Sequence, residues 1–207
     1  MLSTASLLTW IVLALAAAMS PGPDTLLVLG HAGRNGRRAG LLAVSGIVTG
    51  GLWYILLCGF GMLSVLTASP TVFAVVKFAG ALYLAWLGLA LLRSAIKPET
   101  VAEPDQIMLA RHPFRQGLLT NALNPKIALF YLAVLPQFTG SGPDAPMIGM
   151  ALIAIHFFLG GLWLSALAIV ASRVSKWVGS TGTRRWLEGI LGAGFIGLAG
   201  KLALERN

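Results

Sequence analysis

Residues 7–29 read LLTWIVLALAAAMSPGPDTLLVL, and the rest of the chain is interpreted from this stretch. It is apolar over the roughly 20 residues that an α-helix needs to cross a bilayer. Pro21 and Pro23 interrupt it, with Gly22 between them and Asp24 directly after. Because proline removes a backbone donor and glycine tolerates unusual dihedral angles, a continuous helix is not expected here. The stretch predicts a broken membrane helix with a charge at the break.

The composition excludes a soluble domain and several kinds of site. Hydrophobic residues make up 57% of the 207 and charged residues only 11%, with a mean hydropathy of +0.81, so the bilayer is the expected solvent. The net charge of +8 lies in short basic clusters between apolar runs, where it acts as a topology signal, so no nucleic-acid partner is expected. A single cysteine, Cys58, excludes a disulfide within the chain and a cysteine-rich metal site, and we predict no metal or cofactor.

Apolar run lengths predict an all-α integral membrane protein with a single transmembrane domain over residues 1–207. A first repeat at 1–93 and a second at 116–207 are joined by a polar linker at 94–115. Each repeat holds three spans, an odd number, so the second repeat enters the membrane from the opposite side and the repeats are inverted. The six predicted transmembrane helices cover residues 7–29, 40–66, 72–92, 117–135, 147–171 and 186–204.

The basic residues predict the orientation of these spans. Lys and Arg gather in the first, third and fifth connections, beginning with a basic turn at Arg34, Arg37 and Arg38. Connections rich in Lys and Arg stay on the cytoplasmic side. Both termini are therefore expected outside. Lys77, near the outer end of the third span, is expected to reach the interface by snorkelling.

The first span of the second repeat carries a matching break. Residues 121–126 read NALNPK, so Lys126 directly follows Pro125 as Asp24 follows Pro23. A charge near the bilayer centre costs about 2.5–3.5 kcal/mol on insertion scales, so such residues are usually paired or line a polar cavity. Broken helices of inverted repeats commonly hold the substrate. We predict that an amino acid binds with its ammonium at Asp24 and its carboxylate at Lys126.

Alternatives to this assignment stay open in the sequence. In one, Asp24 caps the helix after the break and Lys126 forms a fixed ion pair with it. Asn121 and Asn124 are either substrate ligands or partners for carbonyl groups that the proline break releases, and Ser20 is a weaker candidate of the same kind.

His156 is the histidine that falls within a predicted span. Together with Asp24 it is a candidate for binding the coupling proton, and the alternative is a packed, hydrogen-bonded histidine. Intramembrane aromatic residues, Tyr54 among them, either line a cavity or pack between helices.

Two long motifs resemble a known family. Residues 20–50, SPGPDTLLVLGHAGRNGRRAGLLAVSGIVTG, and residues 114–138, FRQGLLTNALNPKIALFYLAVLPQF, are similar to the two signatures of the lysine and homoserine/threonine exporter family. The resemblance covers nearly the whole chain and includes KFAGALYLAWLG at 77–88. It implies a six-span efflux carrier for amino acids or their derivatives, driven by the proton gradient, in the inner membrane of a bacterium.

Other functional classes fit the sequence less well. An enzyme is not expected, because there is no recognisable order of nucleophile, histidine and acid and no HExxH motif. A carrier of metal cations or other small ions is the main alternative, since an acid in a broken helix binds a cation as readily as an amine. Lys126 argues against a simple cation pore. The spans are expected to contact lipid, and assembly into a homo-oligomer stays open.

Overall fold

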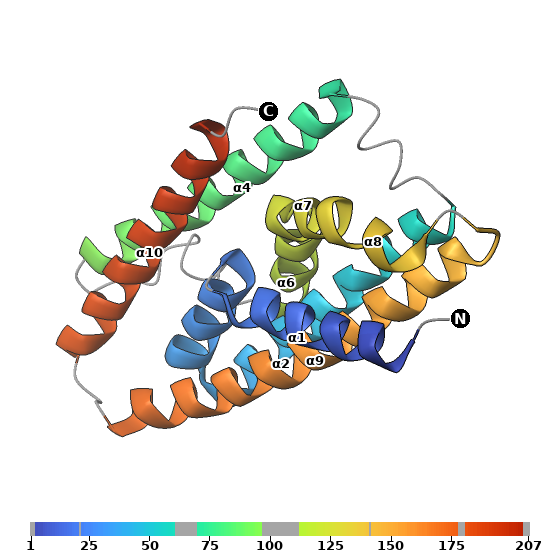
Figure 1. Cartoon of the computed structure of the whole chain (residues 1–207). Helices are drawn as coiled ribbons and strands as arrows, with labels where there is room; N and C mark the ends of the chain where they lie inside the picture. The colour runs from blue at the N-terminus through green and yellow to red at the C-terminus, as the bar shows by residue number, and fades with distance from the viewer. Residues whose placement is uncertain are drawn as a thin grey trace.

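The computed structural model describes residues 3–20, 22–60, 70–96, 112–140, 142–177 and 181–204. Every regular element within these ranges is an α-helix, as the sequence predicts (Figure 1). Two of the described helical stretches, Pro23–Gly59 and Ala145–Val174, are long and apolar enough to cross a membrane. The count of six spans stays a prediction.

The first predicted span consists of two helices, and the second of these continues into the next span. α1 runs Thr4–Met19 and α2 runs Pro23–Gly59, beginning at a proline whose fixed φ suits the first helical position. The chain turns where the basic turn at Arg34, Arg37 and Arg38 was predicted, and it does so without a loop. It is helical on both sides of Gly36, whose φ of 80° and ψ of −179° change the helix direction. A glycine in this conformation makes the bend without additional loop residues.

The second break has the same form as the first. α6 runs Pro113–Ala122 and α7 runs Pro125–Val134, and they are separated at Leu123 and Asn124. α8, Pro136–Thr139, is a single turn that follows α7. The predicted start of this span at residue 117 was late, because Pro113 opens the helix in a polar segment that apolar run length does not detect.

The remaining helices extend beyond the predicted spans. α4 runs Pro70–Ile96, α9 runs Ala145–Trp177 and α10 runs Thr181–Leu204. The helices therefore take up both ends of the linker predicted at 94–115. The middle of this linker, residues 97–111, lies outside the described residues. The end of the predicted second span, residues 61–66, also lies outside them. At the helical rise the 33 residues of α9 are about 50 Å long, which exceeds the roughly 30 Å of a hydrocarbon core.

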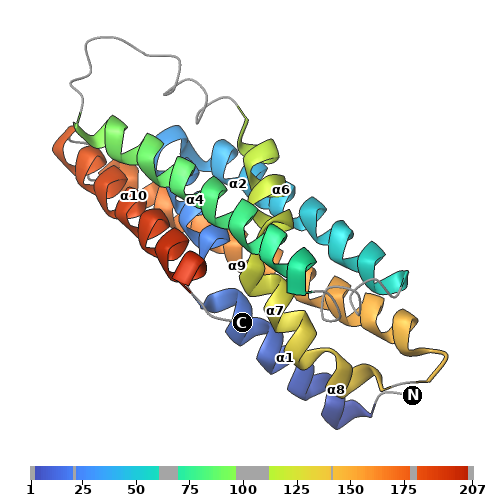
Figure 2. The same ribbon diagram turned by 90° about the horizontal axis from the view of Figure 1, so that it is seen from above.

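The extensive packing joins helices of different repeats. α2 packs along both α9 and α6, α4 along α10, and α1 against α9. Figures 1 and 2 show α4 and α10 side by side. At the contact of α2 with α6 the backbones touch, since a Cβ at Gly46 would overlap the Phe114 carbonyl and one at Gly117 would overlap the Ala43 carbonyl. Only glycine permits this approach, which holds the second break beside α2.

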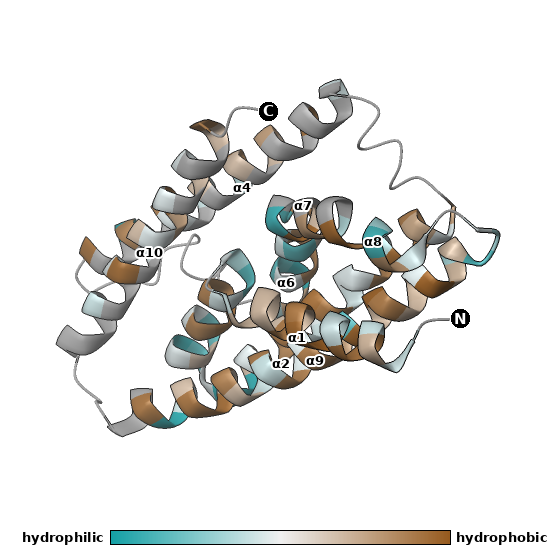
Figure 3. Cartoon of the chain, in the orientation of Figure 1, coloured by the Kyte–Doolittle hydropathy of each residue, from teal (hydrophilic) through white to brown (hydrophobic). Residues whose placement is uncertain are grey.

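Large apolar side chains are exposed on the outside of the helices, as expected for a surface that faces lipid. Examples are Leu8 on α1, Leu52 on α2, Leu82 on α4, Phe158 on α9 and Trp186 on α10. Figure 3 shows α9 to be apolar along most of its length, whereas α6, at the centre of the arrangement, carries polar residues. Buried polar residues of the described chain include Gln116, Thr120 and Asn121 on α6 and Asn124 at the second break.

Candidate functional site

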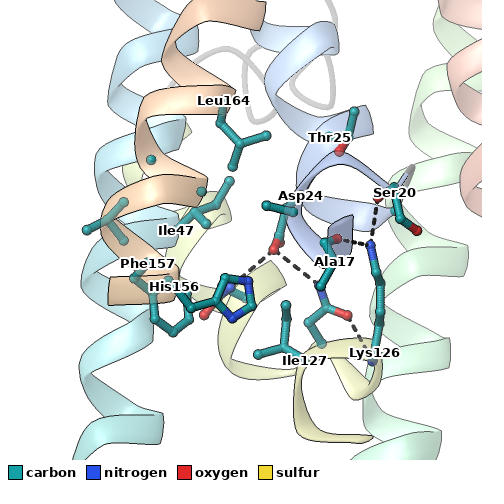
Figure 4. A pocket seen from close by; sticks show the side chains of 17 residues that line it. Ala17, Ser20, Asp24, Thr25, Ile47, Lys126, Ile127, His156, Phe157 and Leu164 are labelled. Atoms are coloured by element: carbon teal, nitrogen blue, oxygen red, sulfur yellow. Dashed lines mark hydrogen bonds between the residues drawn. The ribbon is translucent and has the colours of Figure 1, made fainter. Parts of the chain in front are cut away.

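The two breaks meet at one cavity. Asp24 lies in the first turn of α2, and Lys126 lies in the first turn of α7. Figure 4 shows Asp24 between Lys126 on one side and α9 on the other. The cavity volume is about 40 Å³, which is enough for a few water molecules at roughly 10–15 Å³ each. Its lining consists of Ala17, Ala18, Ser20, Gly22, Asp24, Thr25, Ile47, Val48, Asn121, Asn124, Lys126, Ile127, His156, Phe157, Gly160, Gly161 and Leu164.

The Asp24 carboxylate is bound by both asparagines of the second break. Its Oδ2 accepts hydrogen bonds from the Asn121 side chain at 3.1 Å and from the Asn124 side chain at 3.2 Å. Its Oδ1 is buried and accepts no hydrogen bond from any described residue. The alternative in which Asp24 caps α2 was wrong, because the cap position is Gly22 and no side chain bonds there. Asp24 instead connects the first repeat to the second.

The Lys126 ammonium binds backbone rather than the carboxylate. It donates to the carbonyl oxygens of Ala17 at 2.8 Å and Ser20 at 2.6 Å, at the end of α1. These carbonyls lack helical partners because α1 stops at Met19, and the negative end of the helix dipole also attracts the ammonium. Among the described residues no ion pair joins Asp24 to Lys126, so the alternative of a fixed ion pair was wrong.

Asn124 has a second role at the break. Its Oδ1 accepts a hydrogen bond from the Lys126 backbone N–H at 3.1 Å and so caps α7. Asn121 and Asn124 therefore contact Asp24 with their amide nitrogens. Their backbone carbonyl oxygens accept backbone N–H groups, that of Asn121 from Asn124 and that of Asn124 from Ile127 and Ala128. Both oxygens also lie close to the Tyr54 hydroxyl, at 3.2 Å for Asn121 and 3.1 Å for Asn124.

The other residues predicted at the breaks occupy their expected places. Ser20 is exposed, lines the cavity and contributes its carbonyl oxygen to Lys126. Gly22 is extended, and a Cβ there would lie 3.4 Å from Lys126 Nζ. Pro23 and Pro125 each open a helix. Pro21 lies outside the described residues.

His156 lines the cavity from α9 and is buried. Its Nδ1 forms a hydrogen bond of 2.9 Å with the Tyr131 hydroxyl, and its ring packs against Phe157. The structure therefore shows the packed, hydrogen-bonded histidine of the alternative, at a position that also faces the cavity.

A second buried histidine was missed by the sequence analysis. His31 lies on α2 before Gly36, is 4% exposed and donates from Nε2 to Gln116 Oε1 of α6 at 2.6 Å. The predicted first span ended at residue 29, so His31 was not among the expected site residues. The structure shows it buried on α2, which continues past that position. The sequence signal that could have identified His31 is its position seven residues after Asp24, which places both residues on the same face of a helix.

Known proteins resemble this chain over most of its length. The model of the LysE type translocator family matches residues 15–206. A threonine efflux protein of Escherichia coli strain K12 is 30% identical over 195 residues, which cover 92% of this chain and 93% of that protein. A leucine efflux protein of Klebsiella pneumoniae is 29% identical over 206 residues, 95% and 93% of the two chains.

An uncharacterised membrane protein of Pseudomonas aeruginosa is 33% identical over 191 residues, 88% of each chain. No solved structure matches this chain. Because the family model covers both breaks and nearly all the helices between and after them, this membrane protein belongs to the LysE type translocator family.

Proposed function

We propose that the protein exports amino acids or amino-acid derivatives from the bacterial cytoplasm, driven by the proton gradient. One observation carries the proposal: both proline breaks, each with a charged residue, open onto the same cavity. Substrate sites of inverted-repeat transporters lie at broken helices between the repeats. The relatives named threonine and leucine efflux proteins make these two amino acids the first candidates.

The proposed topology has six spans in two inverted repeats, with both termini outside the bacterial inner membrane. The packing supports the inversion, because α1 of the first repeat lies on α9 of the second, and α6 of the second lies on α2 of the first. The side-chain contacts are reciprocal in the same way. Asp24 of the first repeat binds asparagines of the second, and Lys126 of the second binds carbonyls of the first.

The proposed binding mode is that of a zwitterion. The substrate ammonium lies at the Asp24 carboxylate, whose Oδ1 has no donor among the described residues. The substrate carboxylate lies at Lys126, since an ammonium has three N–H donors and Ala17 and Ser20 accept two of them. Asn121, Asn124 and Ser20 complete the site.

Proton coupling is proposed to use Asp24, with His156 as a second candidate. Both residues line the cavity, and a carboxylate inside the membrane binds either a proton or a cationic group. If the carboxylate binds either a proton or the substrate ammonium but not both, the protein exchanges a proton for a substrate. An antiporter requires this exchange.

Transport in proteoliposomes tests the proposal. Purified protein is reconstituted, a proton gradient is imposed, and uptake of labelled leucine, threonine and a divalent metal cation is measured. Asp24→Asn and Lys126→Met, each of which removes the charge, are compared with the wild type after size-exclusion chromatography shows that they are folded. Asp144→Asn is the matched control, because Asp144 is an exposed acid that does not line the cavity.

Gradient-driven amino-acid uptake that Asp24→Asn abolishes and Asp144→Asn retains supports the proposal. Metal flux without amino-acid uptake would overturn it in favour of an ion carrier. Full amino-acid transport by both cavity variants would remove Asp24 and Lys126 from the substrate site.

A further inference from the structure

The α9 side of the cavity lacks side chains where two glycines follow one another. Gly160 and Gly161 both line the cavity, one helical turn after His156 and Phe157. Ala17 and Ala18 of α1 also line it. The space next to the charged breaks is therefore bounded partly by residues with little or no side chain.

The two glycines differ in the room around them. A Cβ at Gly161 would lie 3.0 Å from Val48 Cγ2, so a side chain there would crowd the packing of α9 against α2. A Cβ at Gly160 would lie 3.7 Å from the Ala18 Cβ, which is an ordinary van der Waals contact, and it would meet nothing closer. Helix packing therefore does not require glycine at position 160, and the missing side chain leaves room in the cavity.

The charged residues that line the cavity limit which substrates it can bind. Among the described lining residues, Asp24 is the one acid and Lys126 is the one lysine or arginine. The ammonium and the carboxylate of an amino acid are the charges that pair with these two side chains. A charged substrate side chain would lack a partner among the apolar lining residues. These are Ile47, Val48, Ile127, Phe157 and Leu164.

We propose that Gly160 sets the upper size of the substrate side chain and that the preferred substrates are amino acids with uncharged side chains. This inference rests on the proposed function and adds to it the residue that determines specificity. The substrate side chain lies against Gly160 and Ala18, on the α9 side of the two breaks.

The test measures a selectivity ratio rather than an activity. Uptake of labelled leucine and labelled alanine into proteoliposomes is measured for the wild type and for Gly160→Ala, with unlabelled lysine and glutamate as competitors. Because one methyl group in an apolar pocket changes discrimination by about ten- to two-hundredfold, the ratio of leucine to alanine uptake should fall at least about tenfold in Gly160→Ala.

Two further variants separate specificity from folding. Gly189→Ala is the matched control, because Gly189 is a helical glycine of α10 outside the cavity whose Cβ would meet nothing within 4 Å. Its ratio should equal that of the wild type. Ala18→Gly combined with Gly160→Ala removes the methyl group opposite the new one and should restore leucine uptake.

The outcomes separate this inference from the proposed function. A wild type that transports no amino acid would overturn both. A wild type that transports leucine and alanine, with an unchanged ratio in Gly160→Ala or with equal competition by lysine, would overturn the inference alone. A reduced ratio in Gly160→Ala that the double variant restores supports it.

Discussion

The Lys126 ammonium donates a hydrogen bond of 2.8 Å to the carbonyl oxygen of Ala17, in the last turn of α1. A second bond of 2.6 Å goes to Ser20. One flexible side chain of the second repeat thus satisfies two carbonyl groups that the first proline break releases. The charge stabilises the break directly, in addition to any role in binding substrate.

Lys126→Met is expected to lower the free energy of unfolding by about 1.5–3 kcal/mol, because hydrogen bonds to a charged group are lost from carbonyls that have no other described partner. Lys126→Arg, which keeps the charge and the donors, should retain most of the stability. The measurement is thermal unfolding of purified protein in detergent. Equal stability of the methionine variant and the wild type would show that the two carbonyls find other partners.

Tyr54→Phe is expected to destabilise the second break. The Tyr54 hydroxyl is shared between the carbonyl oxygens of Asn121 and Asn124 and is buried, so its loss should cost about 0.6–1.7 kcal/mol, the range found for polar contacts between membrane helices. Tyr83→Phe is the control, because the contacts of the Tyr83 hydroxyl with described residues are long, at 3.4 and 3.5 Å. The same unfolding assay checks both, and an equal loss in the two variants would contradict the role of Tyr54.

His31 and Gln116 are expected to be energetically coupled. His31→Leu and Gln116→Leu should each destabilise, because each leaves the other's buried polar group without this bond. The double variant should be less destabilised than the sum of the two single effects, with a coupling of about 0.5–3 kcal/mol. Additive losses in a double-mutant cycle would show that the hydrogen bond of 2.6 Å contributes nothing to stability.

Gly36→Ala is expected to cost about 1–3 kcal/mol, since its φ of 80° and ψ of −179° are accessible almost only to glycine. Clashes with other parts of the protein do not contribute, because a Cβ there would meet nothing within 4 Å. Gly142→Ala has the same open surroundings without a positive φ and should leave stability unchanged. A loss of equal size in both variants would rule out the backbone conformation as the cause.

The helices and both breaks could be predicted from the sequence because they depend on local properties. Apolar run length determines which segments enter the bilayer, and Pro23 and Pro125 determine where helices restart. The change of direction near Arg34, Arg37 and Arg38 was predicted, but its form was not. Sequence alone does not show which of many glycines adopts the positive φ that replaces a loop at Gly36.

The contacts within the site could be predicted only in part. Asp24, Asn121, Asn124 and Lys126 were expected together and do lie around one cavity. Their bonding pattern was not foreseen, because opposite charges in a sequence suggest an ion pair, whereas the partners of Lys126 are backbone carbonyls that carry no sequence signal. The role of Tyr54 depends in the same way on the backbone of another helix.

The packing of α1 on α9, of α6 on α2 and of α4 on α10 has a consequence for biosynthesis. The first repeat is synthesised before the second-repeat helices on which it packs. During this time its helices lie in the bilayer without those packing partners. The contacts of α1 with α9, of α2 with α6 and of α4 with α10 can form only after the second repeat has been inserted. Two fragments divided within residues 97–111 would therefore each be targets for membrane proteases when expressed alone and would protect each other when expressed together.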